Sequence, residues 1–445
     1  PPGESGGRLT QRHIVLMWLP LALSAMLMTG EILLVQAAVS RLTDAKLMLA
    51  ALGIMFWLEV LIEAPLIMLL STSTALTTSA QAYGVLKRFM VHLNLGVSAV
   101  AVSIAFIDPL FDLVLRVGMG IPDIVAEPTQ TGMKIMGLWP AAIGWRRFNQ
   151  GILIRYGQPR QVTLGTLVRL LTSALVACSL VISGAFSGIV VAAMTFMSGV
   201  TAEALFAWWK SRAIVERHLR VDTEAPEHPL TYRAAVDFHL PLAATSVLSY
   251  VALPLVNAGL SRMASPQETL AAWPVVYTLI LMFRGPGIAI PETVIALLRR
   301  FDDLASLRRF CLIVTMGSTA LLAVVIVTPL VKLYVRHVVE APRELEPMIM
   351  VGLLGCLLIP GLAALSNFYR GILMASRATN FVYWGMAIYV GATGVGILVG
   401  VIWQTPGIVT AAVAISVATV LETGYLQRRS AAVRAIKWPA ERESS

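Results

Sequence analysis

The segment PAAIGWRRFNQGIL at residues 140–153 recurs 220 residues later as PGLAALSNFYRGIL at residues 360–373. Four further matches follow in the same order at offsets of 220 or 221: LPLA at 19–22 and 240–243, LAA at 49–51 and 270–272, Pro65 and Pro286, and Gly165 and Gly385. One short apolar match is expected by chance. Paired prolines and a shared F-x-x-G-I-L motif in register instead indicate a duplicated chain with two halves of like architecture.

The composition excludes a soluble globular protein. Of the 445 residues, 57% are hydrophobic and only 13% are charged, whereas about 25% of the residues of a soluble domain are charged. Because about 20 apolar residues cross a bilayer, a chain of this length and character holds about twelve transmembrane helices. The sequence therefore predicts an all-α polytopic membrane protein.

Hydropathy divides these helices into two sets of six. We expect the first set near 14–38, 47–70, 84–107, 131–154, 161–184 and 186–209, and the second near 235–258, 270–298, 310–330, 347–373, 380–402 and 407–427. The predicted domains are an N-lobe at 1–209, a cytoplasmic linker at 210–233 and a C-lobe at 234–445 with a short basic tail. Six helices return the chain to its starting side, so the repeats are parallel and related by an axis along the membrane normal. Two such lobes are typical of alternating-access transporters.

The distribution of Lys and Arg predicts the topology. The net charge is +9, and most of the basic residues fall in the termini and the even-numbered loops. Because cytoplasmic loops are enriched in Lys and Arg, both termini are predicted to be cytoplasmic, in a multi-pass protein of the plasma (inner) membrane. The basic excess therefore does not indicate a nucleic-acid partner.

Motifs of soluble enzymes are absent from the sequence. It has no GxxxxGK[ST] phosphate loop and no HExxH motif. Its three cysteines, Cys178, Cys311 and Cys356, lie in apolar runs without CxxC spacing. We expect neither an enzyme nor a metal or other cofactor.

Acidic residues at membrane depth are the first candidates for function, because a charge that faces lipid costs at least a few kcal/mol. Glu31 lies in the first span, and Glu59 and Glu63 share one face of the second, one turn before Pro65. We predict that these three carboxyl groups couple transport to a proton or another cation. The alternative is a static ion pair or a residue that snorkels to water.

Basic and amide side chains in the spans are the second set of candidates. Arg147 and Gln150 are equivalent to Asn367 and Arg370, and each pair lies on one helical face. Arg284 occupies the position equivalent to Glu63, so these two opposite charges are predicted to pair across the central cavity when it closes.

Guanidinium groups bind carboxylates and phosphates well, so a cavity that contains Arg147, Arg284 and Arg370 favours anionic substrates. The alternative is that the arginines near span ends anchor to lipid headgroups. We expect Arg169 to snorkel in this way.

Two superfamilies combine parallel six-helix halves with the lack of a phosphate loop. The GxxxDRxGRR loop of major-facilitator proteins is missing, since residues 71–88 read STSTALTTSAQAYGVLKR. The sequence instead resembles the multidrug/oligosaccharidyl-lipid/polysaccharide (MOP) exporter superfamily, in particular its progressive ankylosis (Ank) family. The matching residues are PLVN at 254–257 with Ser261-Arg262, Gly30-Glu31, GIL at 151–153 with Gly165, and Pro286 with Glu292.

The resemblance implies the MATE-like MOP fold and the export of small anions such as pyrophosphate, ATP or citrate, with Asn257 as a further substrate contact. The chain departs from the animal pattern at two positions, because Arg147 stands in place of an aromatic residue and Arg284 in place of a histidine. Both departures leave the identity of the substrate open.

The leading hypothesis is a monomeric secondary transporter, working as an antiporter, that exports a small anion of the citrate, pyrophosphate or nucleotide class. Its substrate contacts are predicted at Arg147, Gln150, Asn257, Arg284 and Arg370. The alternatives are a multidrug exporter or a flippase of lipid-linked saccharides with the same architecture. An intramembrane enzyme or a scaffold is disfavoured by the paired repeats.

Overall fold

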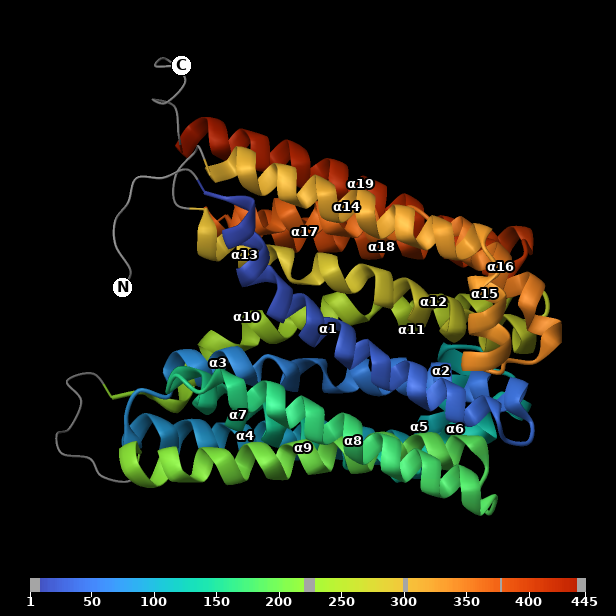
Figure 1. Ribbon diagram of the computed structural model, residues 1–445. Helices are drawn as coiled ribbons and strands as arrows, with labels where there is room; N and C mark the ends of the chain where they lie inside the picture. Colours follow the sequence, from blue (N-terminus) through green and yellow to red (C-terminus); the bar gives the residue numbers. More distant parts are fainter. Residues whose placement is uncertain (1–8, 220–228, 299–302, 377, 438–445) are drawn as a thin grey trace. The chain divides into compact units, whose positions relative to one another are not determined.

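The structure is a computed structural model that describes residues 9–219, 229–298, 303–376 and 378–437 (Figure 1). These described residues form helices and no strand. The elements of the first repeat are α1 (Gln11–Ser40), α2 (Ala45–Ile67), α3 (Leu69–Leu76), α4 (Ala80–Phe106), α5 (Asp108–Phe111), the π-helix η1 (Asp112–Gly118), α6 (Asp123–Met136), α7 (Trp139–Arg155), α8 (Pro159–Ser183) and α9 (Gly188–His218). Those of the second repeat are α10 (Tyr232–Tyr250), α11 (Ala252–Leu260), α12 (Pro266–Ile288), α13 (Ile290–Leu297), α14 (Asp303–Val327), α15 (Leu330–Leu333), the π-helix η2 (Tyr334–Val338), the 3₁₀ helix η3 (Arg343–Leu345), α16 (Glu346–Gly355), α17 (Ile359–Ala375), α18 (Thr379–Trp403) and α19 (Gly407–Lys437).

Ten helical segments of the described chain are long and apolar enough to cross a membrane. Two further segments complete the predicted twelve. Helix α1 has 30 residues and is about 45 Å long at 1.5 Å per residue, which exceeds the hydrocarbon core of about 30 Å. Helices α6 and α7 follow each other with a break at Gly137–Leu138. The prediction of an all-α polytopic membrane protein is confirmed.

Paired prolines mark where the second helix of each repeat is interrupted. Pro65 lies near the end of α2, and α3 begins after a break at Met68. Pro286 occupies the same place in α12, and α13 begins after a break at Ala289. Because proline has no N–H to donate, it weakens the helix locally in both repeats.

The duplication extends to single backbone conformations. Residues with a left-handed φ of 50–66° occur in pairs at offsets of 220 or 221: Asp44 and Ser265, Gly120 and Glu340, and Gly184 and Gln404. The left-handed region is uncommon for residues other than glycine. Its recurrence at equivalent positions shows that the two repeats share the geometry of their loops as well as their helices.

The described chain forms two compact units that differ from the predicted lobes. Of the described residues, the N-unit contains 33–219, 229–274 and 338–345, and the C-unit contains 9–32, 275–298, 303–337, 346–376 and 378–437. Helices α10 and α11 of the second repeat thus pack in the N-unit, and the start of α1 packs in the C-unit. The lobes at 1–209 and 234–445 describe sequence repeats and stay a prediction.

The predicted linker at 210–233 is shorter in the structure, because α9 continues to His218 and α10 begins at Tyr232. Residues 220–228 of the linker and the tail beyond residue 437 lie outside the described residues.

Helices α1 and α10, which we call the exchanged helices because the start of α1 and the whole of α10 pack in the unit formed mainly by the other repeat, make equivalent side-chain hydrogen bonds. In the C-unit, Trp18 Nε1 of α1 donates to the carbonyl of Pro286, at 2.8 Å. In the N-unit, Nε2 of His239, the equivalent residue of α10, lies 3.1 Å from the carbonyl of Pro65. Both carbonyls belong to the last turn of a helix, where no intrahelical partner exists.

His239 is fixed on both sides. A carbonyl only accepts, so His239 Nε2 carries the proton, and Nδ1 accepts from the Thr72 hydroxyl, 2.9 Å away. The imidazole therefore bridges the break between α2 and α3. Trp18 and His239 attach the exchanged helices at the interrupted ends of α12 and α2.

Replacing Trp18 with Phe is expected to lower the free energy of unfolding by about 1–3 kcal/mol, because the Pro286 carbonyl loses its donor while the ring that packs on Phe310 is retained. Unfolding in mixed micelles with increasing sodium dodecyl sulfate measures the change. The matched control is Trp403→Phe, at a residue that is 74% exposed, and it should change stability by less than about 0.5 kcal/mol. Equal effects of the two variants would contradict the assignment.

Candidate functional site

The N-unit contains a buried carboxylate surrounded by donors. Glu203 of α9 is 1% exposed. It accepts hydrogen bonds from Arg146 and from Gln150 Nε2 at 2.9 Å, both on α7. From α8, Thr166 Oγ1 lies 3.4 Å and Arg169 Nη1 3.6 Å from the carboxylate. We call these five residues the Glu203 cluster.

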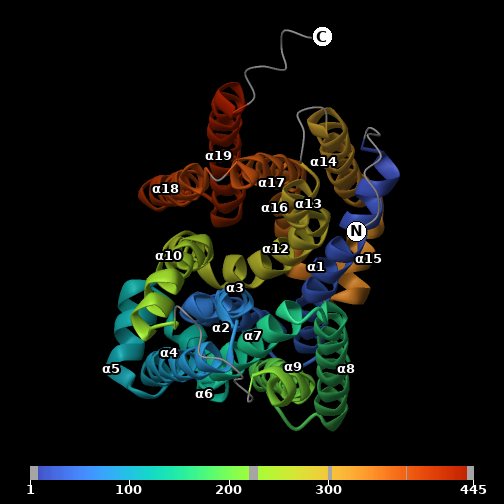
Figure 2. The ribbon, with the colours of Figure 1, turned by 90° about the vertical axis from the view of Figure 1, so that its left-hand side faces the viewer.

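Helix geometry brings the cluster together. Arg146 and Gln150 are four residues apart on α7, and Thr166 and Arg169 are three apart on α8, so each pair lies on one helical face. Both faces are directed at α9, which packs against α7 and α8 (Figure 2). The Arg169 guanidinium also lies over the ring of Trp139, 5.6 Å from its centre.

Arginine is in excess over carboxylate in this region. Arg146 and Arg169 both pair with Glu203. A third arginine, Arg147, is half-buried and interacts electrostatically with Glu203, Glu63 and Arg146. Within the described part of the chain, its Nε has no hydrogen-bond partner. The N-unit therefore holds an arginine whose hydrogen bonding is incomplete, beside a carboxylate that already pairs with two other arginines.

Two further carboxyl groups are buried on α2. Glu59 is 0% and Glu63 is 5% exposed. Both oxygens of Glu59 and Oε2 of Glu63 lack a hydrogen-bond partner among the described residues. Removing a carboxyl group from water without compensation is costly, so these atoms are suited to binding a proton or a cation.

The C-unit contains a second cluster around Glu422 of α19. Glu422 is 3% exposed and pairs with Arg370 of α17, whose Nε lies 3.1 Å away. Arg284 of α12 is half-buried and donates to the hydroxyl of Tyr277, at 3.1 Å. Arg284 also interacts electrostatically with Tyr389 and Glu422. These five residues form the Glu422 cluster.

The two clusters occupy equivalent places in the repeats. Glu203 and Glu422 are 219 residues apart, and each accepts a hydrogen bond from the equivalent residue of α7 or α17, Gln150 or Arg370. Neither glutamate was among the sequence candidates. The signal was available, because both are single acidic residues in apolar spans, followed by equivalent serines, Ser211 and Ser430.

The structure gives several predicted residues a partner. Gln150 and Arg370 are held by the two glutamates. Asn257 of α11 is 2% exposed, and its Nδ2 lies 3.5 Å from the Gly53 carbonyl. Glu31 is 2% exposed in α1.

The expectation that Arg169 snorkels is wrong. Its side chain is only 10% exposed and pairs with Glu203, because the buried carboxylate offers a stronger partner than water at the lipid headgroups. The pairing of Glu63 with Arg284 stays a prediction, since the first lies in the N-unit and the second in the C-unit.

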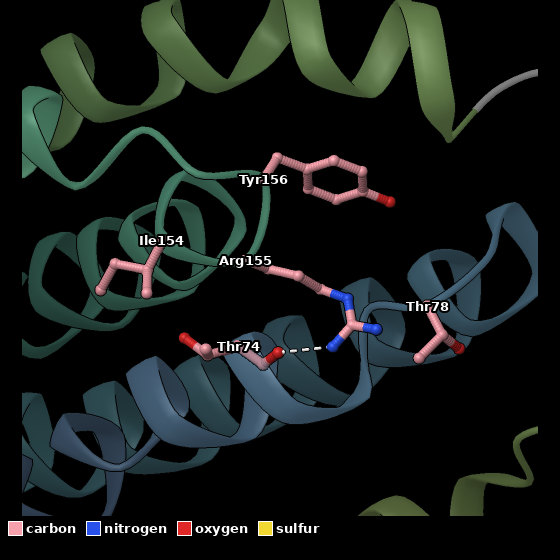
Figure 3. A pocket seen from close by; sticks show the side chains of 5 residues that line it. All are labelled: Thr74, Thr78, Ile154, Arg155 and Tyr156. Carbon is pink, nitrogen blue, oxygen red and sulfur yellow. Dashed lines mark hydrogen bonds between the residues drawn. The ribbon is translucent and has the colours of Figure 1, made fainter. Parts of the chain in front are cut away.

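A surface pocket of about 620 Å³ lies at the ends of α3 and α7 (Figure 3). Arg155 extends into it and donates to the carbonyls of Thr74 and Ala75, at 2.8 and 3.0 Å. These carbonyls belong to the last turns of α3, so Arg155 caps that helix and complements its dipole. None of the predicted site residues lines this pocket.

Comparison with solved structures identifies the fold. No family model and no curated protein matches the sequence. Among solved structures, an inward-facing multidrug resistance MATE transporter of the MOP superfamily has a TM-score of 0.72 at 14% identity, over 95% of this chain and 99% of that chain. The chain has the MATE fold.

Two other solved structures have a similar fold. The lipid II flippase MurJ in an inward closed conformation has a TM-score of 0.69 at 12% identity, over 92% of this chain and 87% of that chain. A MOP superfamily transporter from Pyrococcus furiosus has a TM-score of 0.64 at 16% identity, over 97% and 99%. These neighbours confirm the predicted MATE/MOP-like fold class, and at such identities they establish the fold alone.

Replacing Arg146 with Met is expected to lower the free energy of unfolding by about 3–5 kcal/mol, because it removes the main partner of a buried carboxylate. Arg212→Met is the control, since Arg212 forms an ion pair with Glu216 on the surface with its side chain 61% exposed, and exposed pairs contribute about 0–1 kcal/mol. Both values come from equilibrium unfolding in micelles. If Arg146 served only as a lipid anchor, the two losses would be similar.

Proposed function

We propose that the protein is a secondary active transporter of the MOP superfamily, similar to the Ank family, that exports a small organic or phosphate-bearing anion by alternating access. The substrate class is that of citrate, pyrophosphate or a nucleotide. Two observations support a transporter: the MATE fold, shared with proteins described as transporters and a flippase, and charged side chains buried within membrane-spanning helices.

The incomplete hydrogen bonding of Arg147 and Arg284 carries the proposal of an anionic substrate. Each is half-buried, and its Nε is buried without a hydrogen-bond partner among the described residues. An arginine offers five donors in a planar fork that matches carboxylate and phosphate oxygens. An anion would complete these donors and offset the positive excess of each cluster.

The other proposed substrate contacts have a secondary role. Gln150, Arg370 and Asn257 already donate to protein acceptors, so we propose that Gln150 and Asn257 shape the N-unit around Arg147, and that Arg370 shapes the C-unit around Arg284. The departures from the Ank pattern fall at these two arginines. We therefore assign them the selection among anions.

Replacing Arg147 or Arg284 with Gln should raise the apparent KM for the anion about 10- to 100-fold, because a charge-assisted hydrogen bond contributes about 1.5–3 kcal/mol. Uptake of radiolabelled citrate, pyrophosphate and ATP into proteoliposomes measures the change. Arg212→Gln on the exposed surface should leave the KM within about twofold. Unchanged uptake by both the Arg147 and the Arg284 variant would contradict the assignment.

We propose that Glu59 and Glu63 of the N-unit bind the coupling ion, because of their unpartnered, buried oxygens, and that Glu31 of the C-unit takes part in the coupling. A proton is the ion that such atoms take most simply. A pH gradient across the vesicle membrane should then accelerate anion uptake, and Glu59→Gln combined with Glu63→Gln should abolish the acceleration while exchange down the anion gradient persists. Glu127→Gln, at an exposed residue, is the control. Acceleration by a sodium gradient in place of the pH gradient would exclude the proton.

The alternative is a multidrug exporter or a lipid-linked saccharide flippase, which the MATE and MurJ neighbours favour. The charge of the substrate separates these functions. In the same vesicles, uptake of a lipophilic cation without uptake of any anion would support the multidrug exporter, and movement of a fluorescent lipid-linked saccharide between leaflets would support the flippase.

A further inference from the structure

A second group of charges lies in the N-unit, away from the Glu203 cluster. Arg41, just beyond α1, pairs with Glu340 in the loop after η2, at 2.9 Å. Lys46, in the first turn of α2, pairs with Glu268 in the first turn of α12, at 2.8 Å, and with Glu344 of η3, at 3.3 Å. All five residues belong to the N-unit.

The signs of these charges divide between the repeats. Arg41 and Lys46 come from the first repeat, and Glu268, Glu340 and Glu344 come from the second. Every ion pair therefore joins one repeat to the other. The side chains are 24–43% exposed, apart from Glu344 at 76%. Water reaches all three pairs, so they break at low cost.

The backbone of Glu340 shows that its side chain is placed for this contact. Its φ is +55°, in the left-handed region, and the equivalent residue of the first repeat is Gly120, with φ +66°. Glycine adopts this conformation without cost, whereas a residue with a Cβ is strained. A glutamate at this position retains the strain and gains the ion pair with Arg41.

The equivalent contact, from the second repeat to the loop at Gly120 of the first, contains no carboxylate. Arg262, the counterpart of Arg41, donates to the carbonyls of Val117 and Gly118, at 2.9 and 2.6 Å, beside Gly120. This contact also joins the two repeats, but it is a set of hydrogen bonds to backbone. Comparison of the two repeats therefore shows that this loop does not require a carboxylate. The ion pair of Glu340 is specific to the second repeat.

We infer that Arg41, Lys46, Glu268, Glu340 and Glu344 form an ionic latch that holds the two repeats together at this end of the molecule. The distribution of Lys and Arg predicts that this end is extracytoplasmic. The inference rests on the proposed alternating access, in which the second-repeat segments at 266–274 and 338–345 move away from the first repeat at this end to open the site to the outside. The latch then sets the balance between the closed and the open state.

The strength of the latch suits a reversible switch. Loss of one exposed ion pair shifts a two-state equilibrium about two- to fivefold, so three pairs favour closure without preventing opening. Salt also screens exposed pairs, since the Debye length falls from about 10 Å at 0.1 M to about 3 Å at 1 M. The closed state should therefore lose population as salt is added.

The experiment measures the distance between spin labels at Leu113 and Leu333, which are exposed, equivalent positions of the two repeats. The labels are attached to a full-length chain in which Cys178, Cys311 and Cys356 are replaced by Ala, and double electron–electron resonance is recorded in lipid nanodiscs. The unaltered latch should give two distance populations, with the longer one increasing at 1 M salt. In Arg41→Gln combined with Lys46→Gln, the longer population should rise at least about fivefold and become independent of salt.

A second variant separates the latch from a merely structural role. Glu340→Gly removes the carboxylate and relieves the left-handed backbone, so the longer population should rise about two- to fivefold while the unfolding temperature holds or increases. A fall in unfolding temperature with unchanged distance populations would overturn the latch. Two populations that neither variant shifts would overturn the latch alone, whereas one population under every condition would contradict alternating access as well.

Discussion

The pairing of a buried carboxylate with guanidinium groups is the interaction on which the chemistry of this protein depends. A single charge in the interior of a membrane protein is costly, and it is retained where it is paired or used. Glu203 is 1% and Glu422 is 3% exposed, and each is held by an arginine. These pairs fix the fourth and sixth spans of each repeat against each other and leave Arg147 and Arg284 beside them. Around Glu203 and around Glu422 the neighbouring arginines outnumber the single carboxylate, and this local excess is the basis for an anionic substrate.

Duplication explains how one short set of residues supplies both clusters. The repeats share interrupted second helices, left-handed loop positions and a glutamate on the sixth span. They differ where function is proposed, because Glu63 of the first repeat is replaced by Arg284 in the second. Equivalent backbones thus present opposite charges at this position, and at the latch Glu340 stands where the first repeat has Gly120. The common geometry preserves the fold, and the substitutions give each repeat its own task.

Much of the fold could be predicted from the sequence, because apolar length and paired prolines act locally. All twelve spans agree with helical segments, and the interruptions of α2 and α12 follow the paired prolines Pro65 and Pro286. The site was predicted less well. Arg169 was assigned to the lipid interface, because hydropathy does not show which neighbour a side chain faces. Glu203 was missed because its partners come from two other helices, and only the packing of α7 and α8 on α9 reveals the carboxylate as their common acceptor. The packing of α10 in the N-unit likewise depends on contacts distant in sequence.

Isothermal titration calorimetry of the purified protein with citrate, pyrophosphate and ATP, compared with a lipophilic cation such as tetraphenylphosphonium, tests the central claim most directly. The account predicts saturable binding of at least one anion, weakened about tenfold or more when Arg147 and Arg284 are both replaced with Gln, and no binding of the cation. Saturable binding of the cation to the unchanged protein, with no heat from any anion, would contradict it.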